Sequence, residues 1–202
     1  MNGAVSARLP DGRLHLQHGP IDVLVECWAE PAEIEAAYRQ AEARFASILH
    51  ELVGELPRLR EPVAAHYPLL RGAVARRMAA AVWPHREVFV TPMAAVAGAV
   101  ADELMAALLE GRTLRKACVN DGGDIALHIS PGETIDVAIV EDLSRPALGA
   151  TVRILAALPV RGVATSGWRG RSQSLGIADA VTVLAASAAA ADAAATMIAN
   201  AV

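Results

Sequence analysis

The sequence predicts an α+β fold, a layered domain in which a mostly antiparallel sheet packs against helices. Apolar residues recur every three to four positions between about residues 31 and 111, which is the period of helices buried on one side. After Gly111 the pattern changes to short β-branched runs separated by Gly, Pro, Asn or Asp, which is typical of strands. Helices gathered before strands, rather than alternating with them, favour an α+β arrangement.

The length and composition predict one domain. With 202 residues, of which 54% are apolar, the chain can form a substantial core. We therefore expect a single domain over residues 1–202. It consists of an N-terminal hairpin and helices over residues 1–87 and a core that carries the candidate motifs over residues 88–202.

The N-terminal third begins with a predicted β-hairpin over residues 8–28. Residues 13–16 and 21–25 alternate between apolar and polar side chains, and the His18-Gly19-Pro20 sequence between them favours a turn. A helix should follow from Pro31, because proline is common in a first helical turn. We expect this helix to stop at Gly54, since glycine commonly ends helices.

Two further helices are predicted before the strands begin. The first runs from about Pro68 to Trp83, and Pro84 ends it. The second begins near Pro92 and stops at Gly111, and its apolar residues on nearly every side predict burial between layers. It falls within the most apolar stretch, residues 88–109, where acidic residues argue against a membrane span.

The second half of the chain is predicted to form the sheet. Its expected strands cover residues 115–119, 124–129, 134–140, 151–158, 162–165 and 181–185. An alanine-rich helix over residues 187–200 follows them. Positions four apart lie above one another on a helix, so Asp192, Thr196 and Asn200 form one polar row.

The composition narrows the functional classes. The net charge is −4, and the chain has only two Phe, two Tyr and three Trp, so it lacks the basic face and stacking surface of nucleic-acid-binding proteins. Cys27 and Cys118 form no CxxC pair, which favours a reducing compartment. The first ten residues lack the basic and apolar runs of a signal peptide. We therefore expect a cytoplasmic protein with no nucleic-acid or membrane partner, whereas the sequence leaves the oligomeric state open.

The first candidate site is the segment Asn120-Asp121-Gly122-Gly123-Asp124. Adjacent glycines allow positive φ, so that consecutive backbone amides can turn toward an anion. The same residues between two apolar runs are also typical of a plain hairpin turn. Both interpretations remain open from the residues alone.

The second candidate is the segment from Thr165, Ser166 and Gly167 to Arg169 and Arg171. Hydroxyls, glycine and two guanidinium groups suit a phosphate or a carboxylate, because arginine donates hydrogen bonds in pairs. The alternative is a solvated loop whose arginines face water. Trp168 in its middle would be unusual in such a loop.

The third candidate is the pair Asp192 and Thr196. Their carboxylate and hydroxyl share a helix face and can offer hard oxygen ligands to one cation, but two ligands are too few for Mg²⁺. The alternative is an ordinary polar stripe in which Thr196 bonds back to the helix backbone. The histidines show no zinc-ligand spacing, and neither a GxSxG nor a GxxxxGK[ST] motif is present.

Taken in order, these three segments resemble the ApbE family. Its members, once described as thiamine-biosynthesis lipoproteins, are flavin-binding proteins that use Mg²⁺ to split FAD and transfer FMN to a threonine of a target protein. The resemblance covers about residues 88–200 and points to an uncharacterised, shorter ApbE-like branch without the lipoprotein leader. It implies a T-fold-related domain, a nucleotide-like ligand and an acceptor protein.

The resemblance also implies roles for individual residues. Asp192 and Thr196 would hold Mg²⁺ or Ca²⁺ through their side chains, and Asp192 would thereby be the catalytic residue. The family's helix motif matches Ala94, Gly98 and Asp102, so the Ala94 carbonyl would be a third ligand. The flavin nucleotide, FAD or FMN, would be bound by residues of both loops: Asn120, Asp121, Gly122, Gly123, Asp124, Thr165, Ser166, Gly167, Arg169 and Arg171.

Two departures from the family pattern widen the range of functions. Ala97 stands where the transferases carry lysine, and the family's histidine-containing segment ending in Asp-Pro is missing from the short stretch 170–179. We expect Arg169 and Arg171 to replace the lost charge. The sequence thus predicts a Mg²⁺-dependent FMN transferase or FAD pyrophosphatase, and the alternatives are a non-catalytic flavin- or pterin-binding module and a metabolic enzyme of another substrate.

Overall fold

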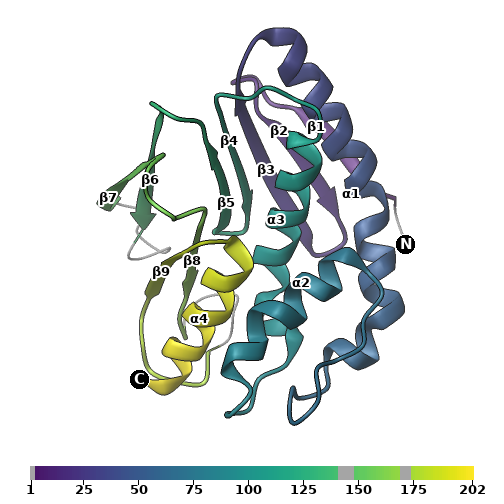
Figure 1. The fold of residues 1–202 in the computed structure, drawn as a ribbon, viewed down its shortest axis with the longest axis vertical. Coiled ribbons are helices and arrows are strands. Elements are labelled where there is room, and N and C mark those ends of the chain that lie inside the picture. The colour runs from purple at the N-terminus through teal and green to yellow at the C-terminus, as the bar shows by residue number, and fades with distance from the viewer. Residues whose placement is uncertain (1–2, 141–147, 169–173) are drawn as a thin grey trace.

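A seven-stranded antiparallel sheet forms the scaffold of the described chain (Figure 1). The computed structural model describes residues 3–140, 148–168 and 174–202. The strand order is β1-β2-β3-β4-β5-β8-β9. The strands span β1 Val5–Arg8, β2 Leu14–His18, β3 Ile21–Trp28, β4 Lys116–Asp121, β5 Asp124–Ile129, β8 Gly162–Ser166 and β9 Val181–Ala185. The predicted α+β class is therefore confirmed.

The N-terminal third extends the same sheet that carries the candidate motifs. The predicted hairpin forms as β2 and β3, and Gly19 in its turn has a φ of 59°. Strand β1, which was not predicted, adds an edge beside β2. Val25 of β3 pairs with Val119 of β4, so the N-terminal hairpin continues directly into the motif-bearing strands.

The helices lie over one face of this sheet, with α3 between α1 and α4 (Figure 1). Helix α1 spans Pro31–Leu59, α2 spans Ala73–Val82, α3 spans Val96–Leu109 and α4 spans Ala188–Ala201. Short 3₁₀ turns, η1 (Trp83–His85) and η2 (Pro92–Ala95), follow α2 and precede α3. The main core lies between the helices and the sheet, where alternate residues of β2 and β3 are buried.

The first two helices differ from their predicted bounds. Helix α1 passes through Gly54 and ends at Leu59. Leu59 is fully buried two turns beyond Leu52. Burial of a leucine side chain stabilises the fold by about 1.5–3 kcal/mol, which exceeds the cost of about 1 kcal/mol for a glycine inside a helix. Helix α2 begins at Ala73, not near Pro68, because Gly72 precedes it in an extended conformation.

Helix α3 is a core helix. The stretch Pro92–Leu109 has the length and apolar composition of a membrane span, but half of it is buried inside the fold. Val100, Leu104 and Leu108 have no exposed surface. Packing against α1, α4 and the sheet accounts for its apolar character.

A separate two-stranded sheet consists of β6 (Thr134–Val140) and β7 (Leu148–Leu155). Strand β7 begins and ends three residues earlier than the predicted 151–158 strand, because residues 156–159 form a turn. Ile135, Val137 and Ile154 join a second apolar cluster with Leu127 and Val163 of the large sheet. This hairpin therefore packs on strands β5 and β8.

Candidate metal and nucleotide site

Helices α3 and α4 approach each other backbone to backbone at Gly98. A Cβ atom at this position would lie 2.4 Å from the carbonyl oxygen of Ala188. Such a distance is far below van der Waals contact, so only glycine allows this approach. The alanines at the start of α4, among them Ala188 and Ala189, are buried in the same contact.

This close approach brings Asp192 to the first turn of α3. The Asp192 carboxyl is 7% exposed, and its Oδ2 accepts a hydrogen bond of 3.0 Å from the backbone N–H of Gly98. Unpaired amides and the helix dipole make a helix N-terminus favourable for a carboxylate. Asp192 thus joins α4 to the motif that the sequence analysis matched at Gly98.

The environment of Asp192 favours its neutral form when no cation is present. Burial, followed by the charges of Asp124 and Asp121, raises the pKa of this carboxyl to about 8, although the amides of Gly98 and Ala97 oppose the shift. The predicted role of Asp121 and Asp124 is nucleotide binding, and nothing in the local sequence connects them with Asp192. A bound cation would relieve the mutual repulsion of these carboxylates.

The Asn120–Asp124 segment forms a tight hairpin turn between β4 and β5. Gly122 and Gly123 both have positive φ, at 64° and 111°, and Asn120 Oδ1 accepts a hydrogen bond of 2.8 Å from the Gly123 N–H. Asp121 pairs with Asp124 at the end of the two strands, and Asp121 is 5% exposed. The turn therefore directs acidic residues toward α4 while the two glycines stay exposed.

Thr196 lies one turn after Asp192, and its hydroxyl contacts strand β8. The distance between Thr196 Oγ1 and Ser166 Oγ is 3.1 Å, and Ser166 is buried. Ala164, two residues earlier on β8, packs against Ala191 and Ala195 of α4. Thr196 and Ser166 are thus brought together, and both hydroxyls are on the side of β8 that faces α4.

The neighbouring residues Thr165 and Gly167 have other surroundings. Thr165 is exposed, and its Oγ1 lies 2.8 Å from Thr182 Oγ1 on β9, on the side of β8 opposite to Ser166. Gly167 is buried against the backbone of Asp179, where a Cβ would lie 2.2 Å from the Asp179 carbonyl oxygen. Arg169 and Arg171, the predicted phosphate ligands, lie outside the described residues.

Ala94 lies in η2, the 3₁₀ turn directly before α3. It is half-buried, and its backbone N–H donates to the Thr91 carbonyl oxygen at 3.1 Å. The η2 turn packs against α4, so the predicted third ligand and the helix carrying Asp192 and Thr196 are neighbours.

Asp102 caps the N-terminus of helix α4, a role that was not predicted from the sequence. Its two carboxylate oxygens each accept a hydrogen bond of 2.9 Å, one from the N–H of Ala188 and one from the N–H of Ala189. These amides begin α4, and the Ser187 side chain accepts a third bond, from Ala190. An acidic residue that caps a helix 86 residues later leaves no local signal in the sequence.

The donor atoms gathered here fit a hard divalent cation. Asp192 offers a carboxylate, Thr196 and Ser166 offer hydroxyls, and Mg²⁺ prefers such oxygen ligands. Within the described ranges, no three His, Cys, Asp or Glu side chains lie close enough to hold one metal ion. A cation at this site would therefore depend on hydroxyl, carbonyl, water or phosphate oxygens in addition to Asp192.

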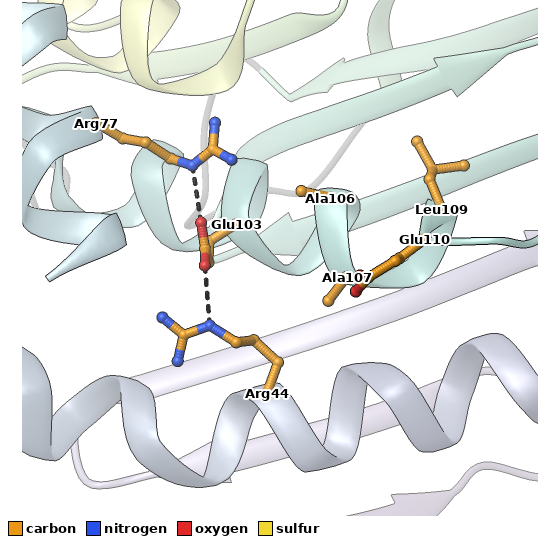
Figure 2. Close-up of a pocket in the computed structure, with 7 residues that line it drawn as sticks. All are labelled: Arg44, Arg77, Glu103, Ala106, Ala107, Leu109 and Glu110. Carbon is orange, nitrogen blue, oxygen red and sulfur yellow. Dashed lines mark hydrogen bonds and ion pairs between the residues drawn. The ribbon is translucent and has the colours of Figure 1, made fainter.

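A separate hollow lies between α1, α2 and α3 and contains none of the predicted site residues (Figure 2). Glu103 bridges two helices there, because its oxygens lie 2.9 Å from Arg44 Nε and 2.9 Å from Arg77 Nε. Arg44 also contacts Glu51 at 2.8 Å. These paired charges join the helices, and we assign the hollow a structural role.

Comparisons with known proteins agree with the resemblance. A UPF0280 protein of Methanothermobacter thermautotrophicus is 43% identical over 117 residues, which cover 57% of this chain and 44% of that protein. A UPF0280 protein of Methanopyrus kandleri is 41% identical over 144 residues, covering 68% and 54% of the two chains. The aligned part thus spans about half the length of these curated relatives.

The family comparison covers nearly the whole chain, including the N-terminal third that the resemblance left out. Residues 6–202 match the family model described as "AbpE bacteria". The chain therefore belongs to this ApbE-like family.

Proposed function

We propose that this protein binds a flavin nucleotide together with Mg²⁺ at the contact of α4 with α3, β5 and β8. The observation that carries the proposal is the buried Asp192 carboxyl. It lies one helical turn before Thr196, whose hydroxyl contacts Ser166, and the charges of Asp121 and Asp124 act on it. Family membership supports a flavin-related function.

Each residue of the proposed cation site has a defined role. Asp192 and Thr196 hold the cation through side-chain oxygens, and the Ala94 carbonyl is the third protein ligand. The Gly98 amide orients the Asp192 carboxyl by donating to its Oδ2. When bound, Mg²⁺ would neutralise phosphate charge and stabilise the charge that develops on a leaving phosphate.

The two loops would then bind the nucleotide. The exposed Gly122 and Gly123 allow close approach of a ligand to the β4–β5 turn, and Ser166 offers a hydroxyl beside Thr196. We expect Arg169 and Arg171 to contact phosphate oxygens in pairs of hydrogen bonds. The proposed reaction breaks the pyrophosphate bond of FAD, releases AMP and joins the FMN phosphate to a hydroxyl of an acceptor protein.

A non-catalytic flavin- or pterin-binding module is the second candidate. Ala97 is at the α3 N-terminus beside Asp192, where the transferases that this chain resembles carry a lysine, so one phosphate-binding charge is missing. Only 14 residues separate Ser166 from Val181, which is too few for the family's histidine-containing segment. Both departures favour binding without transfer.

Incubation of the protein with FAD and Mg²⁺ tests the proposal. Release of AMP and FMN supports catalysis, and FAD binding without release supports the module. The Asp192→Asn variant should lose most Mg²⁺-dependent binding, whereas Asp136→Asn, at an exposed ion pair with Arg153, should behave as the wild type. If FAD with Mg²⁺ leaves the melting temperature of the wild type unchanged, the flavin proposal is wrong, because a ligand at 100 times its Kd stabilises by about 2.7 kcal/mol.

A further inference from the structure

Two loops at one end of the helical layer expose large apolar side chains. The first loop joins α1 to α2 and the second leads from η1 to η2, at the bottom of the molecule in Figure 1. Their exposed apolar side chains, which we call the apolar tip, are Tyr67, Leu69, Val88 and Phe89. Leu69 is 85% exposed and Phe89 is 73% exposed. Single exposed apolar residues are common, but a group of them on adjoining loops is typical of an interaction surface.

Contacts between the two loops hold them together. The Val63 N–H of the first loop donates to the Val90 carbonyl oxygen of the second at 2.8 Å, and both valines are buried in the main core. The Tyr67 ring also packs edge-on against the Trp83 ring of η1, with the ring centroids 5.2 Å apart. Since these contacts join the loops, the side chains of the apolar tip lie at the same end of the molecule.

Arginines accompany the apolar tip, although the chain as a whole is acidic. Residues 56–90 contain six arginines and two glutamates, a net charge of +4, whereas the net charge of the full chain is −4. Four of these arginines are exposed on or next to the two loops: Arg58, Arg60, Arg71 and Arg86. Arg58 Nη1 donates to the Leu69 carbonyl oxygen at 3.0 Å, and the Arg86 guanidinium lies 4.7 Å from the centre of the Trp83 ring. Positive charge and exposed apolar surface therefore coincide at this end of the molecule.

We infer that the apolar tip docks on the surface of a membrane that contains anionic phospholipids. Apolar and aromatic side chains enter the headgroup region of a bilayer, and arginine guanidinium groups pair with lipid phosphates. Such a contact is peripheral, so it needs neither a signal peptide nor a spanning helix. The expectation of no membrane partner depended on those two features, and this inference replaces it. The inference uses none of the candidate-site residues and does not depend on the proposed function.

A lipid surface fits the apolar tip better than a protein surface does. Side chains as exposed as Leu69 and Phe89 have few neighbours in their own chain, and a fluid bilayer can surround them on every side. A rigid protein partner would instead need a matching pocket for each side chain. A second copy of the chain bound tip to tip would bring arginines against arginines, and juxtaposed like charges are unfavourable.

Cosedimentation of the full chain with phospholipid vesicles tests this inference. The protein should bind vesicles of phosphatidylcholine with phosphatidylglycerol, bind pure phosphatidylcholine far more weakly, and dissociate as salt is added. Leu69→Ser and Phe89→Ser should each weaken binding at least about 10-fold, because each removes an apolar side chain from the bilayer. Arg60→Gln should weaken binding about 5-fold, and only to the anionic vesicles, because it removes one positive charge from the membrane surface.

Leu155→Ser is the matched control for the two serine variants. Leu155 is a half-exposed leucine at the end of β7, and β7 lies on a side of the molecule away from the apolar tip (Figure 1). This variant should therefore bind vesicles as the wild type does. Leu69→Ser and Phe89→Ser should melt at the wild-type temperature, because their side chains make few contacts within the fold.

Three results would overturn the inference. Absence of wild-type binding to the anionic vesicles would do so and would point to an acidic protein as the partner. Anionic-vesicle binding that Leu69→Ser and Phe89→Ser leave unchanged would also do so, because charge alone would then account for the attraction. The third result is a dimer in sedimentation velocity that both serine variants dissociate, since a second copy of the chain would then cover the apolar tip.

Discussion

Asp102 and Asp192 each bind the N-terminal amides of the helix that carries the other. Asp192 of α4 accepts from Gly98 of α3 at 3.0 Å, and Asp102 of α3 accepts from the first two amides of α4 at 2.9 Å each. Each carboxylate therefore satisfies donors that have no partner within their own helix, at the positive end of that helix. The two contacts fix α3 and α4 relative to each other at the candidate site.

Removal of Asp102 should loosen α4. Asp102→Ala deprives Ala188 and Ala189 of their acceptor and should cost about 1–2 kcal/mol, the usual effect of a lost helix cap. Asp102→Asn keeps one acceptor oxygen and should cost less. Urea denaturation measures both variants, and an unchanged midpoint for Asp102→Ala would show that Ser187 alone caps the helix.

Gly98→Ala should disrupt the contact between α3 and α4. Its Cβ would lie 2.4 Å from the Ala188 carbonyl oxygen, so the helices must separate and the Asp192 bond must break. We expect a loss of several kcal/mol, at the upper end for single substitutions. The expected loss can be measured by thermal denaturation together with Mg²⁺ titration.

Gly54→Ala is the matched control for this substitution. A Cβ at Gly54 has no atom within 4 Å, and the residue is inside helix α1. Alanine should therefore stabilise the protein by about 0.5–1 kcal/mol, the difference between the two residues in a helix. Destabilisation of equal size in both variants would contradict the close-contact explanation.

Elements with a strong local pattern could be predicted from the sequence. Strands β5, β6 and β9 have the predicted bounds, and the last helix begins at Ala188, one residue after its predicted start, because alternation and turn residues act locally. The extension of α1 past Gly54 could not be predicted in this way. It depends on burial of Leu59, which is a property of the packed domain.

The candidate site likewise has one part with a local sequence signal and another part that only the packing of the domain brings together. The Asn120–Gly123 turn has a local signature and forms the hairpin turn that was one of its two interpretations. By contrast, the bond from Gly98 to Asp192 joins residues 94 positions apart, and it depends on how two helices cross. The pairing of Thr196 with Ser166 likewise required the packing of α4 on β8.

His18 should destabilise the fold through its unpaired ring nitrogens. The residue is 1% exposed beside Phe45 and His50, and within the described parts of the chain neither ring nitrogen has a hydrogen-bond partner. Since a buried unsatisfied polar group costs about 1–3 kcal/mol, His18→Leu should raise the free energy of unfolding by about 1 kcal/mol. The control His128→Leu should lower it, because His128 Nε2 lies 3.1 Å from the Leu114 carbonyl oxygen.

The stability of the metal-free protein should fall as pH rises, because of Asp192. Its pKa is about 8 in the folded chain, through burial and the nearby carboxylates, and near 3.8 when unfolded. Between these values the folded state binds the additional proton, so the stabilisation is complete below about pH 4 and is lost by about pH 8.

Asp192→Asn should flatten this slope while it keeps an acceptor for Gly98, and it should melt above the wild type at pH 9 in EDTA. Mg²⁺ should stabilise the wild type more at pH 9 than at pH 6, since the cation competes with that proton. Identical pH profiles for Asp192→Asn and the wild type would show that this carboxyl is already charged at neutral pH.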